Sequence, residues 1–116
     1  LTYPERLSSG LRGLDFVALR ELTFEKPDLK KFPALELAMI VAQRGGTLPA
    51  VLNAADEVAV KAFLNGNIRF TQIYEVVLEV VSRHSPVAYS TVEEVLGADQ
   101  WARDHAHALI GRYAHV

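Results

Sequence analysis

Residues 49–64 read PAVLNAADEVAVKAFL, and their apolar side chains recur with the period of an α-helix. Every three or four residues one of them falls on the same helical face: Val51, Ala55, Val58, Ala59 and Ala62. Asn65-Gly66-Asn67 follows, and these residue types tolerate the positive φ that commonly ends a helix. A helix with one apolar face is stable only when that face is covered, so the sequence predicts partner helices on either side.

One partner helix is expected on each side of this segment. Upstream, Pro33 suits a first helical position and Gly45-Gly46 a helix end, while downstream Thr71 can cap a helix that runs to about Arg83, before Ser85-Pro86. The apolar faces of these two helices have helical spacing: Leu35, Ala38, Met39 and Ala42 in the first, and Ile73, Val76, Val77 and Val80 in the second.

The last part of the chain predicts one short helix and one longer one. Thr91 and Glu94 have the spacing of a capping box, and Gly97 is expected to close the short helix. A final helical face follows Asp99, formed by Trp101, His105, Ala108, Leu109 and Arg112. Residues 33–116 therefore predict a mainly α fold, a small bundle of four to five helices.

Residues 1–32 have no sustained helical period and are interrupted by proline and glycine. Leu22-Thr23-Phe24 is compatible with a strand, so we expect an extended arm with at most one or two short strands. Such a segment cannot bury its own apolar side chains, so it should lie on another surface. The chain opens at Leu1 without an initiator methionine, and we expect a segment upstream of it.

Composition limits the classes of partner. The 12 Lys and Arg against 14 Asp and Glu give a formal charge of −2, so nucleic acid is not expected as a partner. Without cysteine, the chain has no disulfide, thiolate metal ligand or cysteine nucleophile. No apolar run has the length of a membrane span and no secretion signal is visible, so neither membrane nor export is expected.

The candidate site residues are Asn53, Asp56 and Glu57, which share one side of the central helix. Asp56 and Glu57 could form a carboxylate pair for acid–base or metal chemistry, but adjacent residues on a helix diverge by about 100°. We therefore expect a structural polar cluster that hydrogen-bonds a neighbouring element.

Other residues give no support for catalysis or cofactor binding. His105 and His107 face different directions on a helix, while His84 and His115 are each isolated. Gly45-Gly46-Thr47 follows a helix, whereas a phosphate loop follows a strand and opens a helix. We expect no catalytic, cofactor-binding or metal-binding residue on this chain.

The chain carries several motifs in a fixed order, among them Tyr3-Pro4-Glu5-Arg6, the run from Leu52 to Val60 and the run from Ile68 to Ile73. Together they resemble the C-terminal region of the 1-deoxy-D-xylulose 5-phosphate reductoisomerase family. The resemblance is close over residues 1 to about 83 and looser over the last thirty or so. The matching segments are Tyr3-Pro4-Glu5-Arg6, Leu14-Asp15-Phe16, Leu22-Thr23-Phe24-Glu25, Pro27-Asp28, Phe32-Pro33-Ala34-Leu35, the run from Leu52 to Val60, Ala62-Phe63-Leu64, and the run from Ile68 to Ile73. One departure is Asp56, where the family more often has Asn.

The resemblance implies a role in the non-mevalonate pathway of isoprenoid biosynthesis. Family members convert 1-deoxy-D-xylulose 5-phosphate to 2-C-methyl-D-erythritol 4-phosphate with NADPH and Mg²⁺ or Mn²⁺. They are homodimers with an NADPH domain, a catalytic domain and a C-terminal helical domain, located in the bacterial cytoplasm or a plastid-type organelle. This implies that residues 1–32 are the end of the catalytic domain and a linker arm, that residues 33–116 are the helical domain, and that the missing domains are its partners.

Two alternatives remain open at this point. The chain could be a stand-alone helical module that recognises another protein through its apolar arm. It could also be a small metal enzyme that uses Asp56, Glu57 and a histidine.

Overall fold

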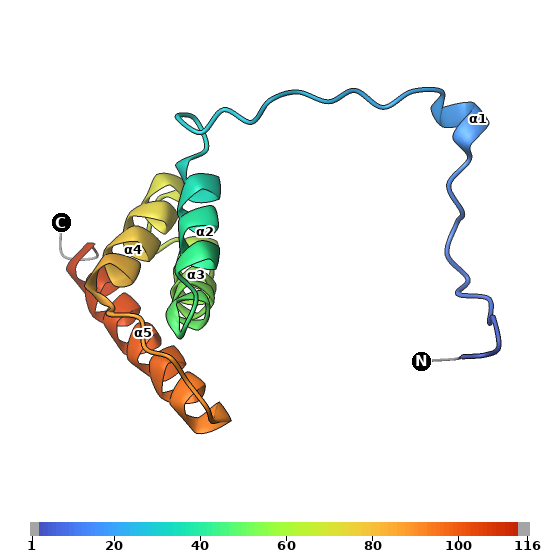
Figure 1. The fold of residues 1–116 in the computed structure, drawn as a ribbon. Helices are drawn as coiled ribbons and strands as arrows, with labels where there is room; N and C mark the ends of the chain where they lie inside the picture. The colour runs from blue at the N-terminus through green and yellow to red at the C-terminus, as the bar shows by residue number, and fades with distance from the viewer. Residues whose placement is uncertain (1–2, 114–116) are drawn as a thin grey trace.

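The structure, a computed structural model, describes residues 3–113. Within this part of the chain five helices follow one another: α1 (Phe16–Leu19), α2 (Pro33–Arg44), α3 (Leu48–Leu64), α4 (Phe70–Arg83) and α5 (Val92–Tyr113). Figure 1 shows α2 to α5 gathered in one bundle, with the chain before α2 leading away from it. The prediction of a mainly α bundle is confirmed.

Helices α2 and α3 begin and end close to the expected residues. Pro33 occupies the first turn of α2, and the helix ends at Gly45, whose φ is +64°. Helix α3 begins one residue before Pro49 and is followed by Gly66, with a φ of +75°. Proline at the start and a residue of positive φ after the end are thus the local reasons for both helices.

Helix α4 begins earlier than the sequence predicted. Its N-cap is Arg69, so the prediction that Thr71 caps it is wrong. The side chain of Gln72 accepts a hydrogen bond of 2.7 Å from the Arg69 N–H, which satisfies that group without a hydroxyl cap. The C-terminal end at Arg83 agrees with the prediction.

Helix α5 combines the two helices predicted for this region. The capping box is present, because Thr91 N–H donates to Glu94 Oε2 at 3.0 Å and Glu94 N–H to Thr91 Oγ1 at 3.3 Å. The expected end at Gly97 is wrong, because the helix passes through it and is 22 residues long in all. Of the final face that the sequence predicted, Leu109 is buried and Trp101 and His105 are half-buried, but Ala108 and Arg112 are exposed. A glycine inside a helix costs about 1 kcal/mol relative to alanine, and the buried side chains that follow it offset that cost: Ala98, Ala102, Ala106, Leu109 and Ile110.

The core lies around α3, which packs against α2, α4 and α5. Leu48 and Val51 of α3 and Val76 and Val80 of α4 are the largest side chains that are fully buried. Most of the buried side chains of α3 and α5 are alanine, and small side chains let two helices approach closely. These alanines are Ala54, Ala55, Ala59 and Ala62 of α3 and Ala98, Ala102 and Ala106 of α5.

The turn between α2 and α3 is fixed to the segment between α4 and α5. Thr47 N–H donates to the carbonyl oxygen of Val87 at 3.0 Å, and Val87 N–H donates to Thr47 Oγ1 at 3.2 Å. Nε2 of His84 lies 2.8 Å from the same Oγ1. Gly46 has a φ of +58°, and a Cβ added there would lie 2.7 Å from the Val87 oxygen. This contact therefore requires glycine at position 46.

The arm before α2 does not pack on the bundle. A compact chain of this length has a radius of gyration of about 13 Å, whereas the observed value is 18.9 Å. Apolar side chains along the arm are exposed, among them Phe16 and Phe24 at 75% and 89%. Within residues 3–113, Leu22-Thr23-Phe24 forms no strand, because no second strand pairs with it. The single turn α1 was not predicted; Asp15 caps it by accepting from the N–H groups of Val17 and Ala18.

Candidate functional site

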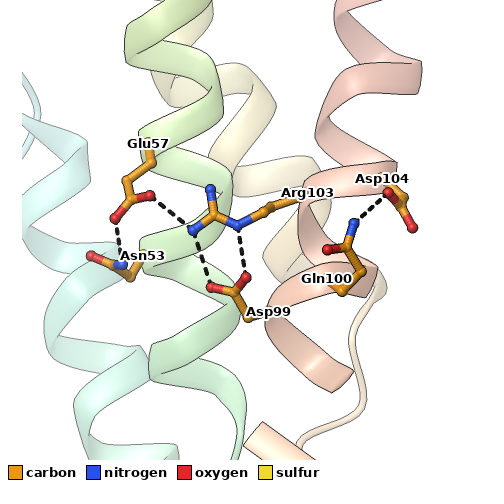
Figure 2. Close-up of polar contacts among 6 residues, drawn as sticks. All are labelled: Asn53, Glu57, Asp99, Gln100, Arg103 and Asp104. Carbon is orange, nitrogen blue, oxygen red and sulfur yellow. Dashed lines mark hydrogen bonds and ion pairs between the residues drawn. The ribbon is translucent and has the colours of Figure 1, made fainter. Parts of the chain in front are cut away.

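Four polar side chains form a cluster between α3 and α5 (Figure 2). The guanidinium of Arg103 donates from Nη2 to Glu57 Oε2 at 2.8 Å and from Nε to Asp99 Oδ2 at 2.7 Å. Asn53 Nδ2 donates to the second oxygen of Glu57 at 3.1 Å. Arg103 therefore joins two carboxylates from different helices, and we call Asn53, Glu57, Asp99 and Arg103 the α3–α5 clamp.

Helical spacing assembles the clamp. Asn53 and Glu57 are four residues apart on α3, and Asp99 and Arg103 are four residues apart on α5, so each pair lies on one face of its helix. The closely packed alanines beside them bring the two faces together. A further pair on α5, Gln100 and Asp104, is joined by a hydrogen bond of 2.9 Å within that helix alone.

Hydrogen bonds within the clamp favour the charged forms of Glu57 and Arg103. The hydrogen bond from Arg103 is the largest cause that lowers the pKa of the Glu57 carboxyl, followed by the hydrogen bond from Asn53. Hydrogen bonds to Asp99 and then Glu57 raise the pKa of the Arg103 guanidinium. Glu57 is consequently ionised at neutral pH, and a carboxylate with a lowered pKa is a poor general acid or base there.

Asp56 does not belong to the clamp, although the sequence grouped it with Asn53 and Glu57. It lies on another side of α3, where it lines a groove together with residues of α2 and α4. The divergence of adjacent helical side chains separates Asp56 from Glu57. The structure thus brings together Asn53 and Glu57 of the three predicted residues.

Sequence reasoning missed Asp99 and Arg103. Their four-residue spacing was a usable signal, but the helix was expected to end at Gly97 and to restart after Asp99, which placed Asp99 in a turn. With α5 as one helix, Asp99 and Arg103 lie about two and three turns inside it, and Arg103 reaches Glu57 of α3.

The rings of His84 and His105 both pack against Trp101. His84 contacts Thr47, and His105 Nδ1 lies 2.9 Å from the carbonyl oxygen of Trp101, on whose ring it stacks at 4.0 Å. His107 lines a hollow next to Glu57 and Arg103. His115 lies outside the described residues. Within residues 3–113, no three side chains of His, Asp or Glu gather closely enough to hold a metal ion.

Residues 1–105 match the family model described as the DXP reductoisomerase C-terminal domain, which is nearly the whole chain. The chain belongs to this family. Among its relatives, the 1-deoxy-D-xylulose 5-phosphate reductoisomerase of Citrifermentans bemidjiense is 50% identical over 111 residues, which are 96% of this chain and 29% of the relative. That of Symbiobacterium thermophilum is 51% identical over 106 residues, covering 91% of the chain and 27% of the relative.

A solved structure gives the same result for the fold of this reductoisomerase domain. The 1-deoxy-D-xylulose 5-phosphate reductoisomerase from Zymomonas mobilis, solved in complex with NADPH, superposes with a TM-score of 0.81 at 42% identity. The match covers 93% of this chain and 29% of that structure. The chain therefore spans less than a third of the length of these relatives. No helix within residues 3–113 is long and apolar enough to cross a membrane.

Proposed function

We propose that the chain serves as the C-terminal structural domain of an NADPH-dependent 1-deoxy-D-xylulose 5-phosphate reductoisomerase. The enzyme would convert 1-deoxy-D-xylulose 5-phosphate to 2-C-methyl-D-erythritol 4-phosphate in isoprenoid biosynthesis. The observation that carries this proposal is the alignment of 96% of the chain, at 50% identity, with such an enzyme. It favours this function over a stand-alone interaction module, because both the arm and the bundle lie within the matched region.

We also propose the division of the chain at residue 32. Residues 1–32 would be the end of the catalytic domain and the arm that crosses it, and residues 33–116 the helical domain. Two features support this division: α2 begins at Pro33, and the apolar side chains before it are exposed, as expected of a segment that covers another domain.

The α3–α5 clamp supports the reaction indirectly in this proposal. A reacting group must be held within about 0.5 Å of its productive position, and rigid elements behind it do this. By tying α5 to α3, Arg103 keeps the bundle in one arrangement.

The described residues do not fit either of the implied cofactors. The carboxylates of the clamp are already paired with Arg103, and no other cluster of metal-type side chains lies within residues 3–113. The chain also has no glycine-rich loop that opens a helix after a strand. NADPH and Mg²⁺ or Mn²⁺ would thus bind the other domains, and we propose that the whole enzyme is a homodimer of the bacterial cytoplasm or a plastid-type organelle.

Assays on the full-length protein and on the isolated chain test this function. The full-length protein should oxidise NADPH only when 1-deoxy-D-xylulose 5-phosphate and Mg²⁺ or Mn²⁺ are present, measured by absorbance. The isolated chain should bind NADPH or the metals with a dissociation constant weaker than ~10 μM, equivalent to about −7 kcal/mol, in calorimetry. A full-length protein without this activity, or tight binding by the isolated chain, would contradict the proposal.

A further inference from the structure

An apolar groove runs between α2, α3 and α4 at the end of the bundle where the arm arrives. Its volume is about 440 Å³, and most of its lining is apolar. Phe70, the first residue of α4, borders the groove with 72% of its surface exposed. An apolar hollow with such an open aromatic side chain marks a site of interaction with another protein surface. The lining includes Phe32, Leu37, Leu52, Asp56 and Ile73.

The arm leads directly into the groove. Lys30, Lys31 and Phe32 are the last residues of the arm and also part of the groove wall. Phe24 and Phe32 are exposed at 89% and 58%, and eight extended residues span at most roughly 29 Å. A domain that contacts the arm at Phe24 is therefore close enough to contact the groove as well.

We infer that the groove receives apolar side chains from the domains that precede this chain in the same enzyme. This inference rests on the proposed function, because it requires those domains. The relatives supply enough chain for it, since this chain covers only 29% of their length. Docking at the groove as well as along the arm would fix the orientation of the bundle, which a flexible arm alone cannot do.

Charge at the rim defines the occupant further. Lys30 and Lys31 lie where the arm ends, and Asp56 lies in the wall contributed by α3. The occupying segment should therefore carry a carboxylate opposite the lysines and a cationic or amide donor opposite Asp56, around its apolar side chains.

Thiol labelling of the full-length enzyme tests the inference. Phe70→Cys places a thiol at the groove, and Val92→Cys is its matched control, because Val92 is the first residue of α5 and is 68% exposed. Both thiols would sit at a helix N-terminus, which has the same effect on their reactivity. The chain has no cysteine of its own, so peptide-level mass spectrometry reads each position separately.

If the groove is occupied, the thiol of the Phe70→Cys variant should be labelled at least tenfold more slowly in the native enzyme than in the urea-unfolded enzyme. For the Val92→Cys variant, the labelling rates of native and unfolded enzyme should differ by no more than threefold. Equal protection of the two positions would overturn the inference. Protection lost on hundredfold dilution, in step with subunit dissociation, would also overturn it, in favour of a second copy as the occupant. If both positions are equally protected in an enzyme that has reductoisomerase activity, the groove is not a docking site and the proposed function stands. If the Phe70→Cys thiol is protected in a full-length protein that lacks this activity, docking is supported and the proposed function is rejected.

Discussion

Gly46 is the residue whose backbone the fold constrains most directly. For a residue with a side chain, the positive φ at this position is unfavourable by about 1–2 kcal/mol. A Cβ there would also lie 2.7 Å from the Val87 oxygen. Gly46→Ala should therefore destabilise the bundle by more than this backbone cost alone. Gly66→Ala is the control, because Gly66 also has a positive φ, of +75°, with no heavy atom within 4 Å of the added Cβ.

Urea unfolding of the two glycine variants measures the difference. The free energy of unfolding should fall further for Gly46→Ala than for Gly66→Ala. Equal losses would mean that the turn between α2 and α3 can move away from Val87 without cost.

His84 makes the stability of the bundle depend on pH. Burial of the ring lowers the pKa of His84 below its ordinary value of 6.5. Below pH 6.5 the unfolded chain binds a proton that the folded chain does not, so the unfolding free energy should fall as pH drops below this value. Above it, His84 is neutral in both states and contributes no pH dependence.

Thermal melts between pH 5 and pH 8 check this prediction. His84→Gln keeps a polar side chain opposite Thr47 but does not titrate. Its melting temperature should fall less between pH 7 and pH 5 than that of the parent chain. The same fall in both proteins would assign the pH dependence to other groups.

At the scale of elements, the contact between α3 and α5 depends on small side chains. Ala102 is fully buried there, whereas Ala108 is an exposed alanine of the same helix. Ala102→Leu should force the helices apart and cost about 1–3 kcal/mol, while Ala108→Leu should change stability by no more than about 0.5 kcal/mol. Chemical denaturation measures both, and a neutral Ala102→Leu would show that the two helices are not closely packed.

The sequence predicted the elements best where a helical apolar face and its end signals agree. For α2 and α3, proline at the start and a glycine or asparagine at the end indicate the bounds, and both helices are confirmed. The buried face expected for α2 is wrong, because Leu37 and Val41 are buried, whereas the four residues of the expected face are exposed: Leu35, Ala38, Met39 and Ala42. For α5, Gly97 suggested an end, but burial of the alanine face of the helix is worth more than the cost of one glycine. Such packing against a distant helix leaves no local trace in the sequence.

The same limit explains what was missed in the candidate site. Asn53 and Glu57 could be paired from their spacing on one helix, but their partner Arg103 is 46 residues from Glu57. Only the packing of α3 on α5 brings it there. Asp56 was grouped with Asn53 and Glu57 from its spacing alone. Its place in the groove depends on how α2 and α4 pack beside α3, which the spacing does not show.

At the scale of the whole molecule, the arm should behave differently in the isolated chain and in the enzyme. With its apolar side chains exposed and no ladder of backbone hydrogen bonds, residues 10–30 should exchange their amide hydrogens much faster than α3 in the isolated chain. In the full-length enzyme the same amides should be protected. If residues 10–30 were as well protected from exchange as α3 in a proven monomer of the isolated chain, the arm would not need another domain to cover it.

We propose that the helical domain supports a reductoisomerase without supplying a catalytic group. Glu57 is the residue at which to test this, because it lies within the run from Leu52 to Val60 that resembles the family and also joins α3 to α5 through Arg103. Glu57→Gln weakens the charge-assisted contact with Arg103 between α3 and α5. Gln100→Ala is the control, because it removes a hydrogen bond that lies within α5 alone.

The decisive measurement is the melting temperature and kcat of full-length Glu57→Gln, with kcat taken well below that temperature. A structural role predicts a lower melting temperature than that of Gln100→Ala, and a kcat within about tenfold of the parent enzyme, equivalent to 1.4 kcal/mol of barrier. An unchanged melting temperature with kcat reduced by about 10²–10⁴-fold, as on loss of a general acid or base, would contradict the claim and place Glu57 in the chemistry.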